Sequence, residues 1–411
     1  MVFSHYNKAI LENGLPVVTE YIPSVRSISL GVWIKAGTRF EEYKHNGVAH
    51  FLEHMMFKGT RNRTSKEIAI SLESVGGNLN AFTTKELTCY FAEILDENLR
   101  KAVNVLSDII CHSTFPPKEI EKEKTVVLDE IHALEDTPED LIQEYLVEKV
   151  FHNHPLSWAI LGHEKSVKNL ERDNLIQFYG DNYSPQNMLI AAAGNIDHMR
   201  LVNLLEKSFK LLPPNFKNNF KAPNSFGFGE HIYHKPINQA HVCLGMPSFA
   251  YNHPKKYELL VLNTLLGGGM SSRLFQNIRE RYGLAYSIYS FLDFYSDSGL
   301  FGIYLGTDKR NLGYAIELVE KEINLIVQRT VSKKVLQEVK SQLKGNLMLS
   351  MESTANRMAR LAKMELYMDG YEEIDRIIEK INNVSADSVM EAATSIFIKN
   401  RLLKILFIPQ N

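Results

Sequence analysis

The chain has 411 residues, of which 45% are hydrophobic and 23% are charged, and its formal net charge is −2 at pH 7. That length is enough to bury the cores of two or three domains, and the near-neutral charge excludes the strongly basic surface that binds nucleic acids. No apolar run approaches the ~20 residues that cross a bilayer, so we expect no membrane insertion. The N-terminus lacks the basic start and apolar core of a signal peptide. The cytoplasm is therefore the expected location, although a mature organellar protein without its presequence would look the same.

Two histidines and a glutamate form the first chemically informative motif. His50 and His54 are four residues apart, so they lie on one face of the helix expected here, and Glu53 projects from the same side. The pattern His-x-x-Glu-His is that of the inverted zincins, in which two imidazoles bind zinc and the carboxylate acts as general base. Catalytic zinc takes three protein ligands and keeps one position for water, so the motif predicts another ligand elsewhere in the chain.

A β-strand is expected next. Residues 76–95 begin with two glycines and continue with alternating Thr, aromatic and aliphatic residues, which is typical of a strand after a turn. Proteases often bind substrate as an added strand, because backbone hydrogen bonds hold any extended peptide while pockets accept alternate side chains. The strand is therefore a candidate for substrate contact, and ordinary sheet packing is the alternative for its aromatic residues.

An acidic helix is expected over residues 119–130. It contains Glu123 and Glu130, which are seven residues apart and hence two turns apart on one face. Most acidic runs of this kind are solvated helices, so the pattern alone does not assign a metal ligand.

A further helix is expected to begin near Thr137, which precedes a proline. Asp140 and Glu144 would share one face of that helix, four residues apart. Such a face would attract basic residues of a peptide substrate. Acidic residues in the first turn of a helix also suit its dipole, and the two interpretations are equally supported.

The chain divides at a linker. Residues 211–230 are rich in Pro, Asn and Gly and show neither helical nor strand periodicity. We therefore predict one half at residues 1–210 and a second half at residues 231–411.

The two halves resemble each other. The segment around Leu99 is similar to the segment around Leu312, and an offset of 213 positions keeps the rest of the halves in register. The chain is therefore predicted to be a duplicated domain. At this offset the metal-binding pattern of the first half falls on residues without metal-binding chemistry, which are Asn263, Leu266, Gly267 and Leu343.

With these motifs the chain resembles the pitrilysin-like inverzincins, especially the branch of bacterial processing proteases and the β-subunit of mitochondrial processing peptidase. In that family the third zinc ligand is a Glu 76 residues after the second His, which corresponds to Glu130 here. The Glu one heptad earlier is the accessory acid of the family's catalytic site, which corresponds to Glu123 and would steady a ligand or its helix.

The resemblance also implies residues that contact the substrate. In the family the second half supplies an Arg and a Tyr seven residues apart, which Arg279 and Tyr286 match. They would donate hydrogen bonds to substrate carbonyls and to the developing oxyanion. A surface ion pair and a half-buried Tyr are the alternative interpretation of these two residues.

Two further groups of substrate contacts follow from the same resemblance. The family binds peptide along the strand that corresponds to Asn80, Ala81 and Phe82, so we assign these residues to substrate binding. In processing peptidases, acids in the region of Asp140 and Glu144 recognise Arg near the scissile bond, and these two residues are assigned accordingly.

The resemblance implies an α+β fold in which each half is a sheet backed by helices, with the halves forming a clam-shell around a peptide cavity. The implied activity is that of a zinc endopeptidase with one zinc per chain, which cleaves short or unfolded peptides, including basic presequence-like ones, in an enclosed chamber. Small members of the family commonly pair, so a homodimer is expected. The first alternative is a catalytically silent partner or core-type subunit of a processing complex. The second is a zinc-stabilised binding module, although structural zinc sites normally have four protein ligands and are rich in Cys.

Overall fold

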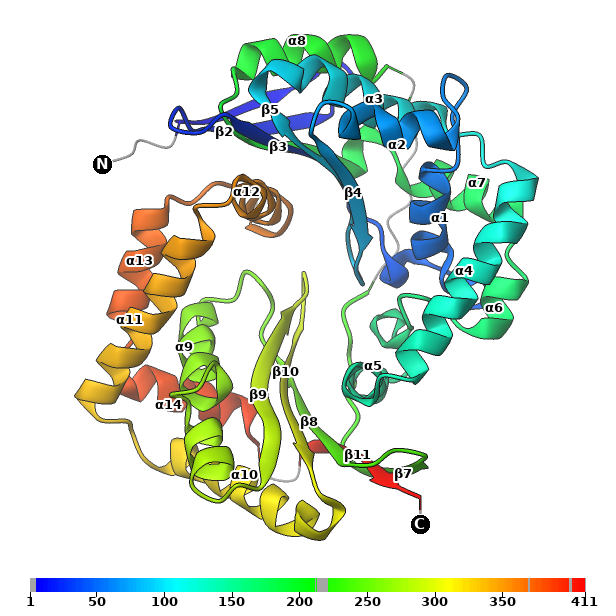
Figure 1. The fold of residues 1–411 in the computed structure, drawn as a ribbon. Coiled ribbons are helices and arrows are strands. Elements are labelled where there is room, and N and C mark those ends of the chain that lie inside the picture. Colours follow the sequence, from blue (N-terminus) through cyan, green and yellow to red (C-terminus); the bar gives the residue numbers. More distant parts are fainter. Residues whose placement is uncertain (1–4, 211, 213–220, 369, 399–400, 411) are drawn as a thin grey trace. The chain divides into compact units, whose positions relative to one another are not determined.

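The structure is a computed structural model and describes residues 5–210, 212, 221–368, 370–398 and 401–410. It has the predicted α+β fold, with two β-sheets that are each backed by helices (Figure 1). Of the predicted linker, residues 211 and 213–220 lie outside the described residues. Among the described residues, no helix is long and apolar enough to cross a membrane.

The first compact unit comprises Met1–His132, Trp158–Phe220 and Ser350–Tyr371. Among the described residues its sheet has six strands in the order β1-β2-β6-β3-β5-β4, in which β2 and β6 pair in parallel and the other neighbours pair antiparallel. The central strands β3 and β6 are buried along almost their whole length, which is expected where helices cover both faces of a sheet. The strand bounds are β1 His5–Ile10, β2 Pro16–Tyr21, β3 Ser27–Ile34, β4 Asn78–Thr83, β5 Thr88–Leu95 and β6 Met188–Gly194.

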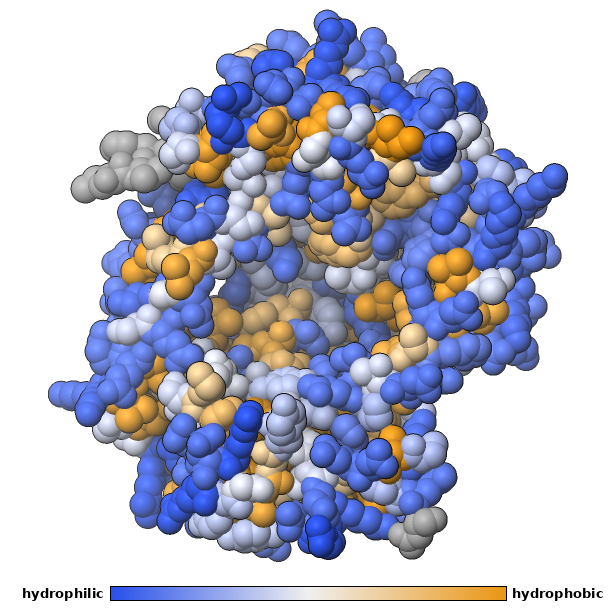
Figure 2. Space-filling view, viewed as in Figure 1, coloured by the Kyte–Doolittle hydropathy of each residue, from blue (hydrophilic) through white to orange (hydrophobic). Residues whose placement is uncertain are grey.

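Amphipathic helices cover this sheet. Several of them turn an apolar stripe toward the strands and a polar side toward solvent. On the face shown in Figure 2, hydrophilic residues dominate the outer surface. The longer helices are α1 Val48–Met56, α2 Ser65–Glu73, α3 Leu99–His112, α4 Pro117–Glu135, α7 Arg172–Asn182, α8 His198–Ser208 and α12 Thr354–Met368.

The second compact unit comprises Ala133–Ser157, Lys221–Leu349 and Glu372–Asn411. Its five-stranded sheet has the order β7-β11-β8-β10-β9. The strands are β7 Gly229–Lys235, β8 Ala240–Ser248, β9 Ala285–Phe294, β10 Gly299–Thr307 and β11 Leu403–Pro409. The helices are α5 Pro138–Val150, α9 Lys256–Gly267, α10 Leu312–Gln328, α11 Lys333–Ser350, α13 Ile374–Asn383 and α14 Ala386–Ile396.

The predicted duplication is confirmed by the order of the elements. Helix α3 begins at Leu99 and α10 begins at Leu312, which is the predicted offset of 213 positions. The strand order β2-β6-β3-β5-β4 of the first sheet corresponds strand by strand to β7-β11-β8-β10-β9 of the second.

Two equivalent helices are exchanged between the halves of the chain. Helix α12 comes from the second half of the sequence and packs on β2, β3 and β6 of the first sheet, with Met358 and Leu361 in the core. Helix α5 comes from the first half and packs on β8 and β11 of the second sheet through Ile142 and Leu146. Each compact unit is therefore discontinuous in sequence, because the second apolar face of each sheet is covered by a helix from the other half.

Candidate metal centre

Helix α1 presents the His-x-x-Glu-His motif on its less buried side. His50, Glu53 and His54 are partly exposed, whereas the opposite side of the helix enters the core. This division follows from the helical period, since apolar residues fill the remaining positions. The buried residues of α1 are Val48, Ala49, Phe51, Leu52, Met55 and Met56.

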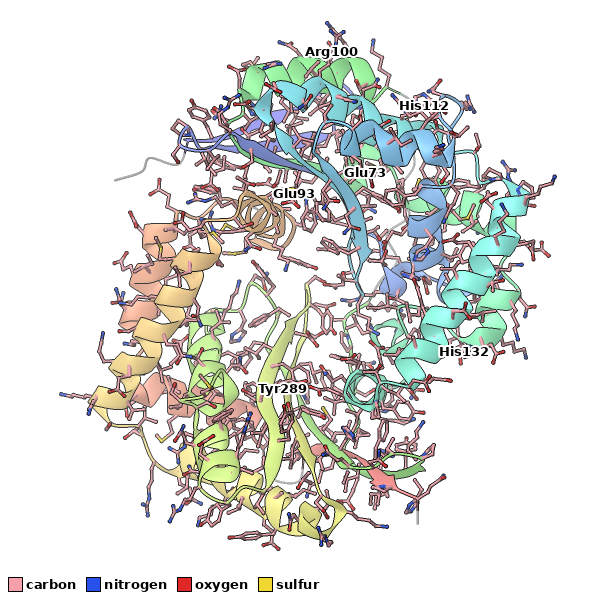
Figure 3. The ribbon with its side chains drawn as sticks, viewed as in Figure 1. Glu73, Glu93, Arg100, His112, His132 and Tyr289 are labelled. Atoms are coloured by element: carbon pink, nitrogen blue, oxygen red, sulfur yellow. The ribbon has the colours of Figure 1, made fainter. Side chains whose placement is uncertain are left out.

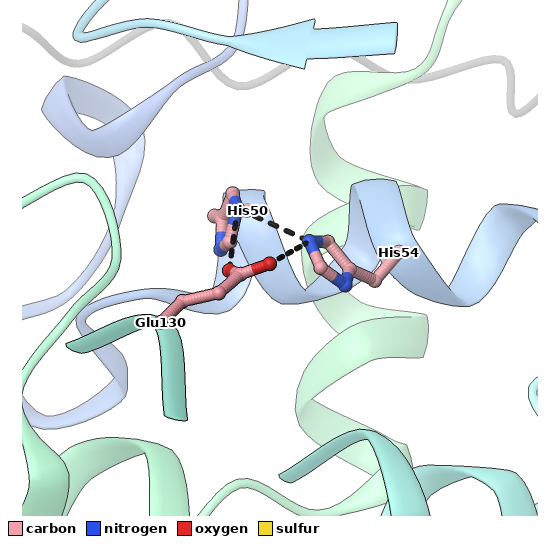
Figure 4. A group of neighbouring side chains, drawn as sticks. All are labelled: His50, His54 and Glu130. Atoms are coloured by element: carbon pink, nitrogen blue, oxygen red, sulfur yellow. Dashed lines mark hydrogen bonds and ion pairs between the residues drawn. The ribbon is translucent and has the colours of Figure 1, made fainter. Parts of the chain in front are cut away.

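Helix α4 brings Glu130 to the two imidazoles (Figure 4). The Nε2 atoms of His50 and His54 lie 3.2 Å apart, and the Glu130 carboxylate oxygens lie 3.6 Å from His50 Nε2 and 3.7 Å from His54 Nε2. Tetrahedral zinc with bonds of about 2.0–2.2 Å needs neighbouring donor atoms about 3.3–3.5 Å apart. The three side chains can therefore hold a metal ion of this size, and their ligand atoms all lie within 4.8 Å of one another.

A neutral imidazole at His50 and a carboxylate oxygen of Glu130 without a hydrogen-bond partner both favour a bound cation. Burial lowers the pKa of His50 to about 3, assisted by the charge of His54, so the imidazole is neutral and its lone pair is available. Glu130 Oε2 is buried and has no hydrogen-bond partner among the described residues. A buried carboxylate oxygen without a partner is costly unless a cation compensates it. The two nitrogens and one carboxylate are a common ligand set of catalytic zinc.

A second carboxylate, that of Glu123, contacts the ring nitrogen of His54 that does not face the other candidate ligands. Glu123, on α4, is 4% exposed, and its Oε1 lies 2.8 Å from His54 Nδ1. The other oxygen lies 2.7 Å from Lys58 Nζ. Burial opposes ionisation, but hydrogen bonds from His54 and Lys58 outweigh it and lower the pKa of Glu123. The arrangement directs the Nδ1 proton of His54 toward Glu123 and leaves Nε2 facing His50 and Glu130, which are the other two candidate metal ligands.

The predicted base, Glu53, is bound to the edge of the first sheet. Its Oε2 accepts a hydrogen bond of 2.5 Å from Thr83 Oγ1, at the end of β4. Burial raises the pKa of Glu53, and the hydrogen bond from Thr83 opposes this shift. A raised carboxylate pKa brings the group closer to the range in which it both accepts and returns a proton near neutral pH.

The predicted substrate residues Asn80, Ala81 and Phe82 lie on β4, the terminal strand of the sheet order. Asn80 is exposed and its Oδ1 accepts a hydrogen bond of 2.8 Å from the amide of Ala81. Phe82 is 37% exposed, and its ring packs edge-on against Trp33 at 5.5 Å. The structure thus brings these three residues to the strand that also carries Thr83, the partner of Glu53.

A buried carboxylate caps the start of α1. Glu41 is 7% exposed and accepts hydrogen bonds from the amides of Gly47 at 2.9 Å and Ala49 at 2.8 Å, and from the Asn46 side chain at 2.8 Å. Gly47 has a φ of 95°, in the left-handed region that favours glycine. Carboxyl oxygens at a helix N-terminus satisfy amides that have no partner within the helix, so this cap fixes where the metal-binding helix begins.

The acidic residues predicted to read basic substrates lie on α5, in the second unit. The helix begins after Thr137 as expected, with Asp140 exposed and Glu144 half-buried. Their neighbour Glu139 accepts a hydrogen bond of 2.9 Å from the hydroxyl of Tyr289, on β9 (Figure 3). The acidic turn is therefore partly engaged with the sheet that α5 covers.

Arg279 and Tyr286 also lie in the second unit, and the structure brings them together. Arg279 is in a π-helical turn, Phe275–Glu280, and its guanidinium lies 5.4 Å from the centre of the Tyr286 ring. Tyr286 is 78% exposed, so its hydroxyl is accessible. Their relation to the metal-binding side chains stays a prediction.

Three residues of this region were not indicated by the sequence. Lys58, Thr83 and Glu41 each contact a predicted site residue or the helix that carries it. Lys58 is 65 positions from Glu123, and Thr83 is 30 positions from Glu53, so no helical or strand period links these pairs. Glu41 is 8 positions from Ala49, across a turn. Only Glu41 had a weak signal in the sequence, because acidic residues near the start of a helix are favoured by its dipole.

This fold, with a His-x-x-Glu-His helix and a distal Glu on a second helix, is the arrangement of the inverted-zincin class of metallopeptidases. Residues 16–164 match the family described as insulinase (peptidase family M16), and residues 169–343 match the peptidase M16 inactive domain. The chain is 40% identical over 395 residues to the "Uncharacterized zinc protease YmxG" of Bacillus subtilis, which covers 96% of each chain. It is 36% identical over 394 residues to an "Uncharacterized zinc protease" of Rickettsia bellii, which covers 96% of this chain and 95% of the relative.

Two solved structures share the fold. A peptidase M16 inactive domain from Pseudomonas fluorescens superimposes with a TM-score of 0.93 at 19% identity, over 99% of both chains. A protease from Helicobacter pylori superimposes with a TM-score of 0.90 at 21% identity, over 99% of this chain and 100% of the other. The chain belongs to peptidase family M16. The predicted resemblance to pitrilysin-like inverzincins is confirmed, and the processing-peptidase branch stays a prediction.

Proposed function

We propose that this protein is a zinc-dependent endopeptidase that hydrolyses short or unfolded peptides, with one zinc per chain held by His50, His54 and Glu130. One observation carries the proposal. The ligand atoms of these three side chains lie within 4.8 Å of one another, and Glu53 stands on the same helix beside an edge strand. A fourth protein ligand is not needed, which suits a catalytic rather than a structural site.

The chemistry of the proposed reaction divides between the metal and the chain. Bound zinc supplies Lewis acidity, which makes water nucleophilic near neutral pH. Glu53 accepts a proton as the water oxygen bonds to the peptide carbonyl carbon, and returns that proton to the leaving nitrogen as the C–N bond breaks. Thr83 holds one oxygen of Glu53 throughout, because its hydroxyl is the donor at 2.5 Å.

The proposed substrate is an extended peptide that adds to the edge of β4. In the described sheet β4 pairs only with β5, so its other edge is available for backbone hydrogen bonds. Asn80, Ala81 and Phe82 would line this edge. Any flexible peptide can adopt the strand conformation, whereas a folded protein must first unfold there, which favours short or unfolded substrates.

Further parts of the proposal concern specificity and assembly. Asp140 and Glu144 are proposed to attract basic side chains of presequence-like peptides, and Arg279 and Tyr286 to donate hydrogen bonds to the substrate. We also propose a homodimer in the cytoplasm. These roles rest on the resemblance to processing peptidases and on the exposure of Asp140 and Tyr286.

Metal analysis together with a peptide library tests the proposal. The purified protein is assayed for zinc and incubated with a mixed library, and the products are identified by mass spectrometry. We expect one zinc per chain, cleavage that stops after chelation and returns with zinc, and internal cut sites. Glu130→Gln should lose zinc and cleavage together. Glu121→Gln is the matched control, because Glu121 lies on the same helix, is exposed and pairs with Lys124.

The competing function is that of a catalytically silent subunit. Such a protein would bind zinc without cutting any peptide in the library, or would need a second chain to do so. Zinc binding without cleavage in the unmodified protein would therefore replace the endopeptidase proposal with this alternative.

A further inference from the structure

Lys58 stands at the outer end of a chain of contacts that leads to the candidate metal ligands. Its Nζ lies 2.7 Å from Glu123 Oε2, and Glu123 Oε1 lies 2.8 Å from His54 Nδ1. Each oxygen of the carboxylate thus has one partner. Lys58 is itself largely covered, with 26% of its side chain exposed.

Lys58 lies just beyond the C-terminal end of the helix that carries His54. The two residues are four positions apart, and α1 ends at Met56, so Lys58 follows the last turn directly. The chain leaves α1 in a tight turn, in which the amide of Lys58 donates a hydrogen bond of 3.2 Å to the carbonyl of Met55. Lys58 therefore stays beside the last helical turn and reaches the same carboxylate as His54. A cation at this place also suits the negative end of the helix dipole.

A cation is required here because Glu123 is almost completely buried, at 4% exposure. When His54 binds the proposed metal through Nε2, it is a neutral imidazole and contacts Glu123 as an uncharged N–H donor. Lys58 is then the only positively charged group in contact with the carboxylate among the ion pairs of the described residues. Without it the carboxylate would be buried without charge compensation, and its free oxygen would have no fixed direction.

We propose that Lys58 is a positioning residue for the metal centre, which orients Glu123 and, through Glu123, the imidazole of His54. This inference rests on the proposed function, since it assigns Lys58 to the zinc site described above. Lys58 touches neither the metal nor the substrate. Its role is to keep Nε2 of His54 directed toward His50 and Glu130 before the metal binds. Metal binding is stronger when the ligands are already oriented.

Zinc affinity measured by competition with a chromophoric chelator tests this inference. Lys58→Met should weaken zinc binding by about 10-fold to 100-fold, the range typical for partners that orient a ligating histidine. Lys58→Arg keeps a positive donor and should recover most of the loss. Lys124→Met is the matched control, because Lys124 is also largely covered, with 15% of its side chain exposed, and pairs with Glu121 on α4. It should not change zinc affinity.

A double-mutant cycle separates positioning from general stability. Glu123→Gln should weaken zinc binding alone, and adding Lys58→Met to it should cause little further loss, because both changes act through one carboxylate. The melting temperature of each metal-free variant reports its fold. An unchanged zinc affinity in Lys58→Met, or equal losses in both backgrounds, would overturn the inference. Failure of the unmodified protein to bind zinc would overturn the proposed function as well.

Discussion

His50 and His54 occupy equivalent places on α1 but differ in what holds their second nitrogen. Nδ1 of His54 contacts Glu123 at 2.8 Å, whereas Nδ1 of His50 is buried and has no hydrogen-bond partner among the described residues. A polar contact at Nδ1 therefore orients His54, whereas His50 has no such contact at Nδ1 among the described residues. A ligating histidine usually donates its second N–H to a carboxylate, carbonyl or water, so His54 has the arrangement expected of a metal ligand.

Thr83 links the proposed base to the proposed substrate strand. Thr83→Val keeps the shape of the side chain but removes the hydrogen bond to Glu53. A hydrogen bond to a charged group contributes about 1.5–3 kcal/mol, so we expect kcat/KM for a library-derived peptide to fall by about 10-fold to 100-fold while zinc content stays the same. Thr83→Ser retains the hydroxyl and should keep most of the activity. Equal kcat/KM for Thr83→Val and the unmodified protein would show that Glu53 does not depend on this contact.

Glu41 gives a prediction for the pH dependence of stability. Burial raises the pKa of Glu41 to about 7, against the opposing hydrogen bonds from Ala49, Asn46 and Gly47. The folded state therefore holds this proton more tightly than the unfolded chain, where the pKa is about 4.3. The resulting stabilisation is present at low pH and is lost as the pH rises from about 4.3 through 7, by about 4 kcal/mol in total.

Glu41→Gln resembles the protonated form and cannot titrate. In metal-free protein, the melting temperature of Glu41→Gln relative to the unmodified protein should rise between pH 5 and about pH 7.5. Calorimetry of both proteins across this range provides the measurement, with the exposed Glu121→Gln as control. A difference that stays constant with pH would mean that Glu41 is already ionised in the folded protein throughout.

The sequence allowed part of this site to be predicted. The spacing of His50, Glu53 and His54 is a local helical property, so it was visible without a structure. The proximity of Glu130 could not be predicted from the residues alone, because a separation of 76 positions from His54 does not indicate contact in space. Only the resemblance to a family indicated it. Lys58 and Thr83 were missed for the same reason, since a lysine or threonine outside any motif does not indicate which carboxylate it will meet.

At the level of elements, local patterns placed the helices correctly but missed a turn in the predicted strand. The single strand expected over residues 76–95 is a hairpin of β4 and β5, because the chain turns back at residues 84–87. The acidic helix predicted over residues 119–130 is the central part of α4, and the helix expected near Thr137 is α5. The exchange of α5 and α12 between the halves was not predicted. The apolar stripe of an amphipathic helix indicates that it packs on a sheet, but the stripe is the same whichever sheet it covers.

Close contact at Gly245 makes this exchange testable. A Cβ atom at Gly245, on β8, would lie 2.6 Å from Leu146 Cδ1 of α5. Gly245→Ala should therefore lower the stability by about 1–3 kcal/mol through overpacking, and Leu146→Ala in the same chain should cancel part of this loss. Gly180→Ala is the control, because no atom lies within 4 Å of its added Cβ and alanine favours the helix. Thermal unfolding would contradict the packing if Gly245→Ala were as stable as Gly180→Ala.

For the whole molecule, the duplication explains why one half carries the metal-binding side chains and the other does not. The same framework, with equivalent strand orders, is repeated at an offset of 213 positions. The positions equivalent to the ligands hold Asn263, Gly267 and Leu343, which do not form a metal site. The framework thus remains while its chemistry differs, as expected when function depends on side chains placed on a fold.

The exchanged helices also predict how the halves depend on each other. Residues 1–210 and 231–411, produced separately, would each lack the helix that covers the second face of their sheet. Each half alone should aggregate or bind a hydrophobic dye, because that face is apolar, whereas production together should restore a soluble complex. Gel filtration and dye binding provide the test. Two halves that are each soluble, monomeric and dye-free would contradict the exchange.

The most direct test of the central claim is to measure zinc content and peptide cleavage in one preparation of Glu53→Gln. Glu53 lies beside the proposed ligands without belonging to them, so the variant should retain one zinc per chain. Loss of the general base should reduce cleavage by about 100-fold to 10,000-fold. Full zinc content with cleavage at the unmodified rate would contradict the assignment of Glu53 as the base.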